Sequence, residues 1–174
     1  MKITVIGDSI TYGYGCNNVW HSHFPDSFEV VNLGVSGCDL QRSTARDNSV
    51  YDRVRDIPLG SDIVYIFAGT NDFGHSLPLD TYERDYNAVI YYIKSYIPNA
   101  KIYVMTPVRR VSNTLDKRGN TLKDFKDIVM SLKGVTHINL YDNVDLITDD
   151  LPDGLHPNDA GQLKIYNEVI KYGN

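Results

Sequence analysis

Residues 3–13 have the sequence ITVIGDSITYG, and this stretch decides the fold. Its first four residues are apolar or β-branched, which predicts a buried β-strand. Gly7, Asp8 and Ser9 follow on the turn that leaves the strand. A strand-to-helix turn exposes a side chain at the edge of a sheet and directs the next backbone N–H groups toward one point. A serine there suits acyl transfer, although Asp8 and Ser9 are also residue types that commonly cap a helix.

Four further segments are rich in β-branched or aromatic residues, and each predicts a strand. They are residues 28–33, 63–67, 102–105 and 136–140. The strands at 3–6 and 63–67 are almost entirely apolar, which is typical of central parallel strands covered by helices on both faces. The strands at 28–33 and 136–140 contain polar residues, as expected at the edges of a sheet.

Helical patterns alternate with these strands. Apolar stripes are formed by Tyr82, Tyr86, Val89, Ile90, Ile93 and Ile97, by Leu122, Phe125, Val129 and Leu132, and by Leu163, Tyr166 and Ile170. This alternation predicts an α/β protein, a three-layer α/β/α sandwich on a five-stranded parallel sheet. We expect its chemistry in the crevice at the carboxyl ends of the strands, where the strand order reverses.

The composition is that of one globular domain covering residues 1–174, with 42% hydrophobic and 22% charged residues. A formal net charge of −5 offers no general positive field for nucleic acid. No apolar run approaches the ~18 residues of a membrane span, and Gly7 and Asp8 interrupt the N-terminal run before a signal-peptide core forms. We therefore expect a cytoplasmic protein without membrane insertion. Two cysteines, Cys16 and Cys38, are too few for a disulfide framework, so we expect both to be reduced thiols rather than a disulfide bridge.

Two other strands are followed by residues that suit an oxyanion site. Gly34 ends the second predicted strand, and a glycine there lets the backbone approach a ligand and present an N–H. Asn71 follows the third strand and places an amide donor at the same edge of the sheet. Each also has a simpler explanation, because glycine and asparagine are common turn formers.

The segment DGLHP at residues 153–157 contains a carboxylate three positions before a histidine. At this spacing Asp153 can accept the Nδ1–H of His156 and leave Nε2 to take a proton from a serine. Turn formation and the start of a helix explain the flanking glycine and prolines, but they do not explain the histidine. None of the other four histidines has a carboxylate at a spacing that would orient it at this edge.

Four short blocks together resemble the SGNH hydrolases, also called the GDSL esterases and lipases. In order, they are GDS at 7–9, the glycine of NLG at 32–34, GTND at 69–72 and DGLH at 153–156. The resemblance spans residues 7–157 and implies a flavodoxin-like sandwich of five parallel strands. It also implies a catalytic triad and an oxyanion hole: Ser9, Asp153 and His156 for the first, and Ser9, Gly34 and Asn71 for the second.

The implied activity is the hydrolysis of short-chain acyl esters, possible substrates including O-acetyl groups on carbohydrates, with no metal or organic cofactor. Ile10 stands where the family name has leucine, an apolar exchange that should leave the chemistry intact. Two other functions stay open. One is flavin binding on a flavodoxin-like phosphate loop, where Tyr12 occupies the place of a glycine. The other is a non-catalytic binding module. Ser36 is a competing nucleophile without a neighbouring histidine in the sequence.

Several residues near the expected crevice have two interpretations. Trp20, Tyr12 and Tyr14 could stack on a sugar ring, and Arg109 or Arg110 could meet an anionic substrate. Packing or solvated surface is the favoured interpretation of each. Residues 107–120 are the longest irregular segment, and we expect a mobile rim there. The sequence determines neither the acyl and alcohol specificity nor the oligomeric state.

Overall fold

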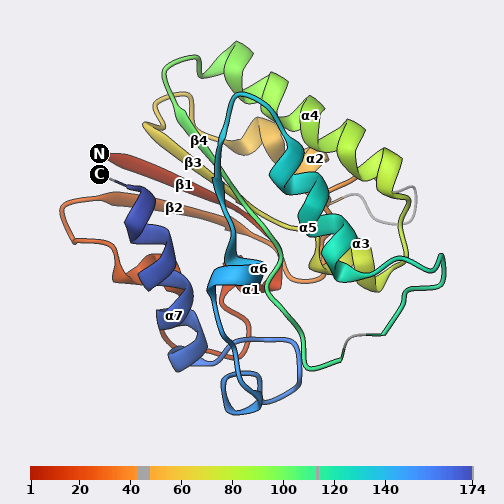
Figure 1. Ribbon diagram of the computed structural model, residues 1–174. Coiled ribbons are helices and arrows are strands. Elements are labelled where there is room, and N and C mark those ends of the chain that lie inside the picture. Colours follow the sequence, from red (N-terminus) through yellow and green to blue (C-terminus); the bar gives the residue numbers. More distant parts are fainter. Residues whose placement is uncertain (43–47, 113, 174) are drawn as a thin grey trace.

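The computed structural model describes residues 1–42, 48–112 and 114–173. Its centre is a parallel sheet of five strands in the order β2-β1-β3-β4-β5 (Figure 1). The strands are β1 (Lys2–Gly7), β2 (Glu29–Gly34), β3 (Ile63–Phe67), β4 (Lys101–Met105) and β5 (Thr136–Ile138). The predicted α/β fold with a flavodoxin-like parallel sheet is therefore confirmed, including β2 and β5 at the edges.

Seven α-helices and four 3-10 helices connect the strands in the described residues. The α-helices are α1 (Ser9–Tyr12), α2 (Val50–Arg53), α3 (Thr70–Gly74), α4 (Leu79–Tyr96), α5 (Leu122–Ser131), α6 (Leu140–Asn143) and α7 (Asp159–Val169). The 3-10 helices are η1 (Trp20–His23), η2 (Val54–Asp56), η3 (Thr148–Asp150) and η4 (Ile170–Tyr172). Helices α4 and α5 lie on one face of the sheet and α7 on the other, giving three layers (Figure 1).

Alternate residues of each central strand enter different cores. In β3, Val64 and Ile66 pack with α4 and α5, whereas Tyr65 and Phe67 pack on the side of η1 and α7. All four are buried. Because successive side chains of a strand point to opposite faces, an apolar strand of this kind needs helices on both sides.

The position of the crevice follows from the strand order. Strand β2 lies on one side of β1, and β3, β4 and β5 follow on the other, so the chain reverses its winding direction at β1. Ligand crevices form outside the carboxyl ends of the strands at such a point. Ser9 comes directly after β1 with only Asp8 between them, and Asn71 lies in the first turn of α3, just after β3.

The predicted stripe of α4 is confirmed. Tyr82, Tyr86 and Ile93 are fully buried, and the helix ends before Pro98. The two tyrosine hydroxyls donate to the carbonyls of Ala68 at 3.0 Å and Ile66 at 3.3 Å. These bonds tie α4 to the end of β3 and to the residue that follows it, close to Asn71.

The predicted stripe of α7 is wrong. Leu163 and Ile170 are 43% and 41% exposed, and Tyr166 is only half-buried. The buried face instead contains Ile165 and Val169, together with Gln162, which is completely inaccessible. Gln162 accepts the backbone N–H of Trp20 and donates to the backbone of α1, so a buried polar residue occupies a position where the apolar pattern predicts a hydrophobic one.

Among the described residues, no helix combines the length and the apolar character that crossing a membrane requires.

Candidate active site

The short helix α1 presents Ser9 at the carboxyl end of β1. Asp8 caps the helix, and its Oδ1 accepts the N–H of Ile10 at 2.9 Å. Gly13, with a φ of 94°, ends the helix and donates its N–H to the carbonyl of Ser9 at 3.0 Å. Because the first N–H groups of a helix lack an acceptor within it, the N–H of Ser9 has no acceptor inside α1 and lies next to its own hydroxyl.

The structure brings Ser9, His156 and Asp153 together in a chain of hydrogen bonds. The Ser9 hydroxyl lies 2.9 Å from Nε2 of His156, across a sequence separation of 147 residues. The other ring nitrogen, Nδ1, lies 2.6 Å from Oδ2 of Asp153. The backbone N–H groups of His156 and Leu155 donate to Oδ1 of the same carboxylate at 2.7 and 2.9 Å.

These hydrogen bonds keep the Asp153 carboxylate charged. Partial burial raises its pKa, but the backbone and side-chain hydrogen bonds from His156 and the N–H of Leu155 outweigh burial and lower the pKa to about 2. An ionised carboxylate is an acceptor only, so Nδ1 of the imidazole must carry a proton. In the neutral ring Nε2 is then the acceptor for the Ser9 hydroxyl, as a general base requires.

The aromatic residues near this site differ in their exposure. The ring of Tyr14 lies 4.6 Å from the ring of His156, and Tyr12 and Tyr14 are 57% and 53% exposed. Trp20 is completely buried and packs edge-on against Tyr65. Packing, the favoured interpretation of Trp20, is therefore confirmed, because the ring belongs to the core beneath α7.

The Asn71 side chain is fixed at the crevice. One N–H of its Nδ2 group donates to the carbonyl of Cys38 at 2.9 Å. A side-chain amide nitrogen carries two hydrogens, so this bond orients the second one and leaves it for another acceptor. The bond also links the loop after β2 to α3.

Gly34 has a structural reason to be glycine that the sequence alone does not reveal. A Cβ atom on Gly34 would lie 2.3 Å from the backbone nitrogen of Tyr12, so the close approach of β2 to α1 excludes any side chain. Its N–H donates to Oδ1 of Asn32 at 2.8 Å. To bind an oxyanion it would have to share or leave that acceptor. Gly37, with a φ of 74°, lies further along the same loop, directly before Cys38.

A second Asp–His pair, which the sequence does not reveal, lies beside the first site. Nδ1 of His75 is 2.6 Å from Oδ1 of Asp39, and 36 residues separate the two in the chain. The Asp39 side chain is only 2% exposed, whereas His75 is 32% exposed. Asp39 follows Cys38, and His75 follows α3, so this pair and the Asn71 bond hold the same two segments together.

Two further carboxylates are completely buried near this loop. Burial raises the pKa of Asp72 to about 7, although it accepts the N–H groups of Leu40 and Gln41 at 2.8 and 3.1 Å. Burial also raises the pKa of Asp8 to about 7, with a contribution from the charge of Asp39. Oδ2 of Asp8 has no hydrogen-bond partner in the described structure, which fits a carboxyl that holds its proton.

The cysteines and the possible metal ligands show no further reactive cluster in the described residues. Cys16 and Cys38 are both free, and burial raises the pKa of Cys38 to about 12. Within the described ranges, no three His, Cys, Asp or Glu side chains are arranged to hold a metal ion. Ser36 is exposed and makes no hydrogen bond with a described histidine.

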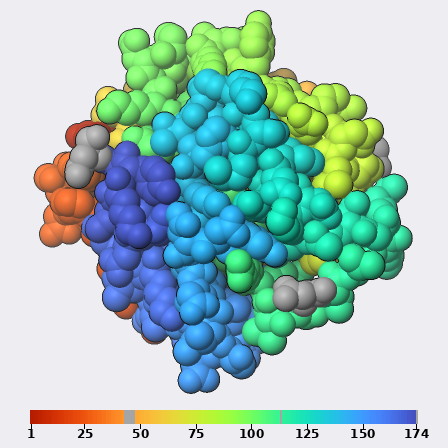
Figure 2. Space-filling view, viewed as in Figure 1, coloured from red at the N-terminus to blue at the C-terminus, as the bar shows by residue number. Residues whose placement is uncertain are grey.

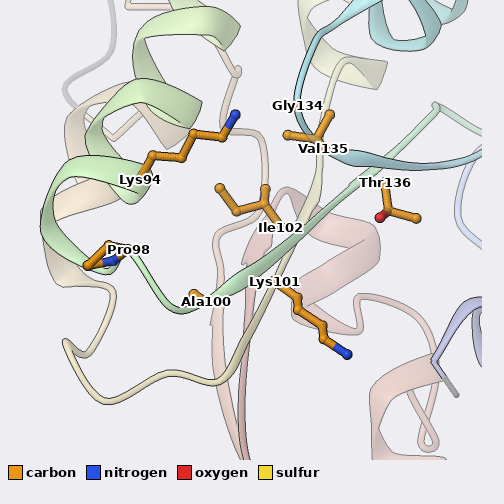
Figure 3. A pocket seen from close by; sticks show the side chains of 8 residues that line it. All are labelled: Lys94, Pro98, Ala100, Lys101, Ile102, Gly134, Val135 and Thr136. Carbon is orange, nitrogen blue, oxygen red and sulfur yellow. The ribbon is translucent and has the colours of Figure 1, made fainter.

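A large hollow lies far from this chemistry. It has a volume of about 620 Å³ and is lined by residues at the end of α4, at the start of β4 and before β5 (Figure 3). Lys94 points across it toward Gly134. This is the amino end of the strands, opposite the crevice. A smaller hollow of about 200 Å³ lies on the crevice side, lined in part by Phe73, Leu122 and Tyr141.

The segment at 107–120 forms hydrogen bonds on both sides of the crevice. The N–H of Val111 donates to the carbonyl of Gly154 at 3.3 Å. At its far end, Lys117 and Arg118 donate to Oγ and the carbonyl of Ser76 at 3.0 and 2.6 Å. Where this segment is described, it has fixed contacts with both site loops. Position 113 lies outside the described residues.

The chain belongs to the GDSL-like Lipase/Acylhydrolase family, whose sequence model matches residues 5–164. The resemblance seen in the four sequence blocks is therefore confirmed at the level of the family, which supports a hydrolase. A comparison with curated proteins finds no match.

Solved structures show the same fold. A protein from Lactobacillus plantarum is 22% identical with a TM-score of 0.89, over 98% of this chain and 95% of that one. A structure described as a lipolytic protein of the G-D-S-L family from Desulfitobacterium hafniense is 24% identical with a TM-score of 0.76, over 98% of each chain. The M. smegmatis aryl esterase is 16% identical with a TM-score of 0.80, over 98% of this chain and 96% of that one.

Proposed function

We propose that this protein is a serine esterase that hydrolyses short-chain acyl esters. The observation that carries the proposal is the hydrogen bond of 2.9 Å between the Ser9 hydroxyl and Nε2 of His156, with Asp153 on the opposite ring nitrogen. In this proposal Ser9 is the nucleophile, His156 the general base and then the general acid, and Asp153 the residue that orients the imidazole.

The reaction has two halves. His156 takes the Ser9 proton as Oγ attacks the ester carbonyl, and the same proton passes to the alkoxide leaving group when the C–O bond breaks. Water then attacks the acyl-enzyme and gives one proton to His156. That proton returns to Oγ of Ser9 as the acid leaves. No metal or organic cofactor takes part in these steps.

Three donors are proposed for the oxyanion that forms in each half. They are the N–H of Ser9, Nδ2 of Asn71 and one N–H from the loop after β2. The sequence blocks favour Gly34 as the loop donor. In that role Gly34 would share its N–H between Oδ1 of Asn32 and the oxyanion.

Aromatic side chains close to the proposed nucleophile and base bear on the class of ester. The exposed Tyr14 beside His156, and the exposed Tyr12 at the end of the helix that carries Ser9, are suited to the face of a sugar or an aryl group, which supports aryl esters and carbohydrate O-acetyl groups as substrates.

Labelling with a fluorophosphonate probe tests the proposal, together with hydrolysis of 4-nitrophenyl acetate. The wild-type protein is expected to be labelled once, on Ser9, and to hydrolyse the ester. Ser9→Ala is expected to lose labelling and about 10⁶-fold in kcat. Ser36→Ala is the matched control, since Ser36 is an exposed serine on the neighbouring loop. An active Ser9→Ala enzyme, or an inactive and unlabelled wild type, would overturn the proposal.

A further inference from the structure

Arg110 differs from the other described arginines in its surroundings. Five of these arginines, Arg42, Arg53, Arg84, Arg109 and Arg118, donate a hydrogen bond or form an ion pair. Arg55 has neither but is exposed to water. Arg110 is half-buried, yet among the described residues its guanidinium has no hydrogen-bond partner and no carboxylate partner.

Arg110 lies between the two loops that carry the candidate catalytic groups. Its Cζ is 5.6 Å from the centre of the Phe73 ring, two residues after Asn71 in the chain. The next residue, Val111, donates its N–H to the carbonyl of Gly154, which is two residues before His156. In Figure 2 the green chain that follows β4 reaches the surface beside the blue segment that precedes α7.

A half-buried guanidinium keeps only part of its hydration, so an anion can replace the remaining water on its unpaired N–H groups. Arginine has five N–H donors in a planar fork that matches a carboxylate or a phosphate. Burial of Arg110 lowers its pKa, and no acidic neighbour among the described residues offsets this effect. The Phe73 ring covers one face of the guanidinium and leaves the N–H groups at its rim unpaired.

We propose that Arg110 binds an anionic group of the substrate, a carboxylate or a phosphate, and makes the enzyme selective for negatively charged esters. This proposal rests on the esterase function proposed above. Arg110 is then a specificity residue, because it binds a part of the substrate away from the reacting carbonyl. Arg109 provides the contrast, because its guanidinium is already paired with Asp142 at 3.6 Å and donates to the carbonyl of Tyr141 at 2.9 Å.

The test compares esters that differ in charge and in the place of the charge. For the acyl side, the pair is the 4-nitrophenyl hemiester of succinate and 4-nitrophenyl butyrate. For the alcohol side, 4-acetoxybenzoate and 4-acetoxyphenyl phosphate are compared with methyl 4-acetoxybenzoate. We expect the wild-type enzyme to have a higher kcat/KM for the anionic member of at least one comparison. The arm in which this occurs identifies the side of the ester, and the type of anion, that Arg110 binds.

Arg110→Met keeps much of the side-chain length over Phe73 and removes the charge. It is expected to lower the ratio of anionic to neutral kcat/KM by about 10–100-fold, the usual value of a charged hydrogen bond. Arg110→Lys keeps the charge without the planar fork, so its ratio should lie between those of the wild type and Arg110→Met. Arg109→Met removes the same charge one residue away and should leave the ratio unchanged.

Ionic strength gives a second measurement that needs no variant. If Arg110 holds the anion, added NaCl should lower the wild-type kcat/KM for the anionic ester more than for the neutral one. An unchanged ratio in Arg110→Met, or an equal fall in Arg109→Met, would refute the role of Arg110 while Ser9-dependent hydrolysis remains. If Arg110→Met does not fold, equal salt dependence of the two wild-type rates would refute it. Loss of Ser9 dependence would instead refute the esterase function itself.

Discussion

The two Asp–His pairs have the same chemistry and nearly the same bond length, but they differ in which partner is buried. In the crevice pair, the Asp153 side chain is 50% exposed and the His156 side chain 17% exposed. In the second pair, the Asp39 side chain is 2% exposed and His75 is 32% exposed. The imidazole of the first pair reaches a serine hydroxyl through its free nitrogen, whereas no described residue hydrogen-bonds to Nε2 of His75.

This difference shows that an Asp–His bond alone does not define a catalytic site. A base needs an acceptor nitrogen that faces a reactive group, and only His156 meets that condition in the described structure. The Asp39–His75 bond instead joins the loop after β2 to the end of α3, the two segments that carry the proposed oxyanion donors. We infer that the first pair moves protons and that the second positions Asn71.

Removing each histidine in turn is the strongest way to break this comparison. His156→Ala is expected to lower kcat on 4-nitrophenyl acetate by about 10⁶-fold, because the serine loses its base. His75→Ala should retain most of the activity. Steady-state kinetics of both variants, with circular dichroism as a control for folding, would reject the distinction if the two losses were similar.

Replacing Asp153 tests the same comparison with a smaller expected loss of kcat. Asp153→Asn is expected to lower kcat by about 10⁴-fold, because the amide no longer holds the imidazole with Nε2 as acceptor. In the wild type, the lowered pKa of Asp153, about 2, means that this carboxyl protonates only in strong acid. The acid limb of a kcat/KM profile against pH should therefore have its midpoint well above 2. A midpoint near 2 would contradict the assignment of the base to an imidazole.

Asn71→Ala should cost less than either triad change. Removal of one oxyanion donor lowers kcat by about 10²–10³-fold, with little effect on KM if Asn71 acts mainly in the transition state. His75→Ala should shift kcat in the same direction by a smaller factor, since it loosens this segment without removing the donor. In the double variant the two effects should not add, because His75 acts through Asn71. Additive losses of kcat would mean that His75 and Asn71 act independently.

The remaining effect concerns stability rather than turnover. Asp8 keeps its proton in the folded protein up to a pH of about 7, whereas an unfolded aspartate loses it near 3.9. The folded state therefore binds more protons between these values, and Asp8 lowers the free energy of unfolding as pH rises from about 4 to about 7. Urea unfolding at several pH values should show a weaker pH dependence in Asp8→Asn. An identical slope would mean that Asp8 is ionised in the folded state.

Local patterns were sufficient to predict the sheet, α4 and the pairing of Asp153 with His156. Each of these depends on residues close together in the sequence, such as the three-residue spacing in DGLH. The Asp39–His75 pair has no such signal, because 36 residues separate its members. The buried face of α7 was mispredicted for a related reason, since Gln162 is satisfied by residues more than 140 positions away. Long-range partners of polar groups are not encoded in local periodicity.

Gln162 has a consequence for when the protein becomes reactive. Its side chain bonds to Ile10 and Trp20, near the nucleophile, while α7 begins three residues after His156. On the ribosome Ser9 emerges early, whereas His156 follows 147 residues later. A nascent chain that stalls before residue 156 has no imidazole for Ser9, so the proposed ester cleavage requires the last part of this sequence.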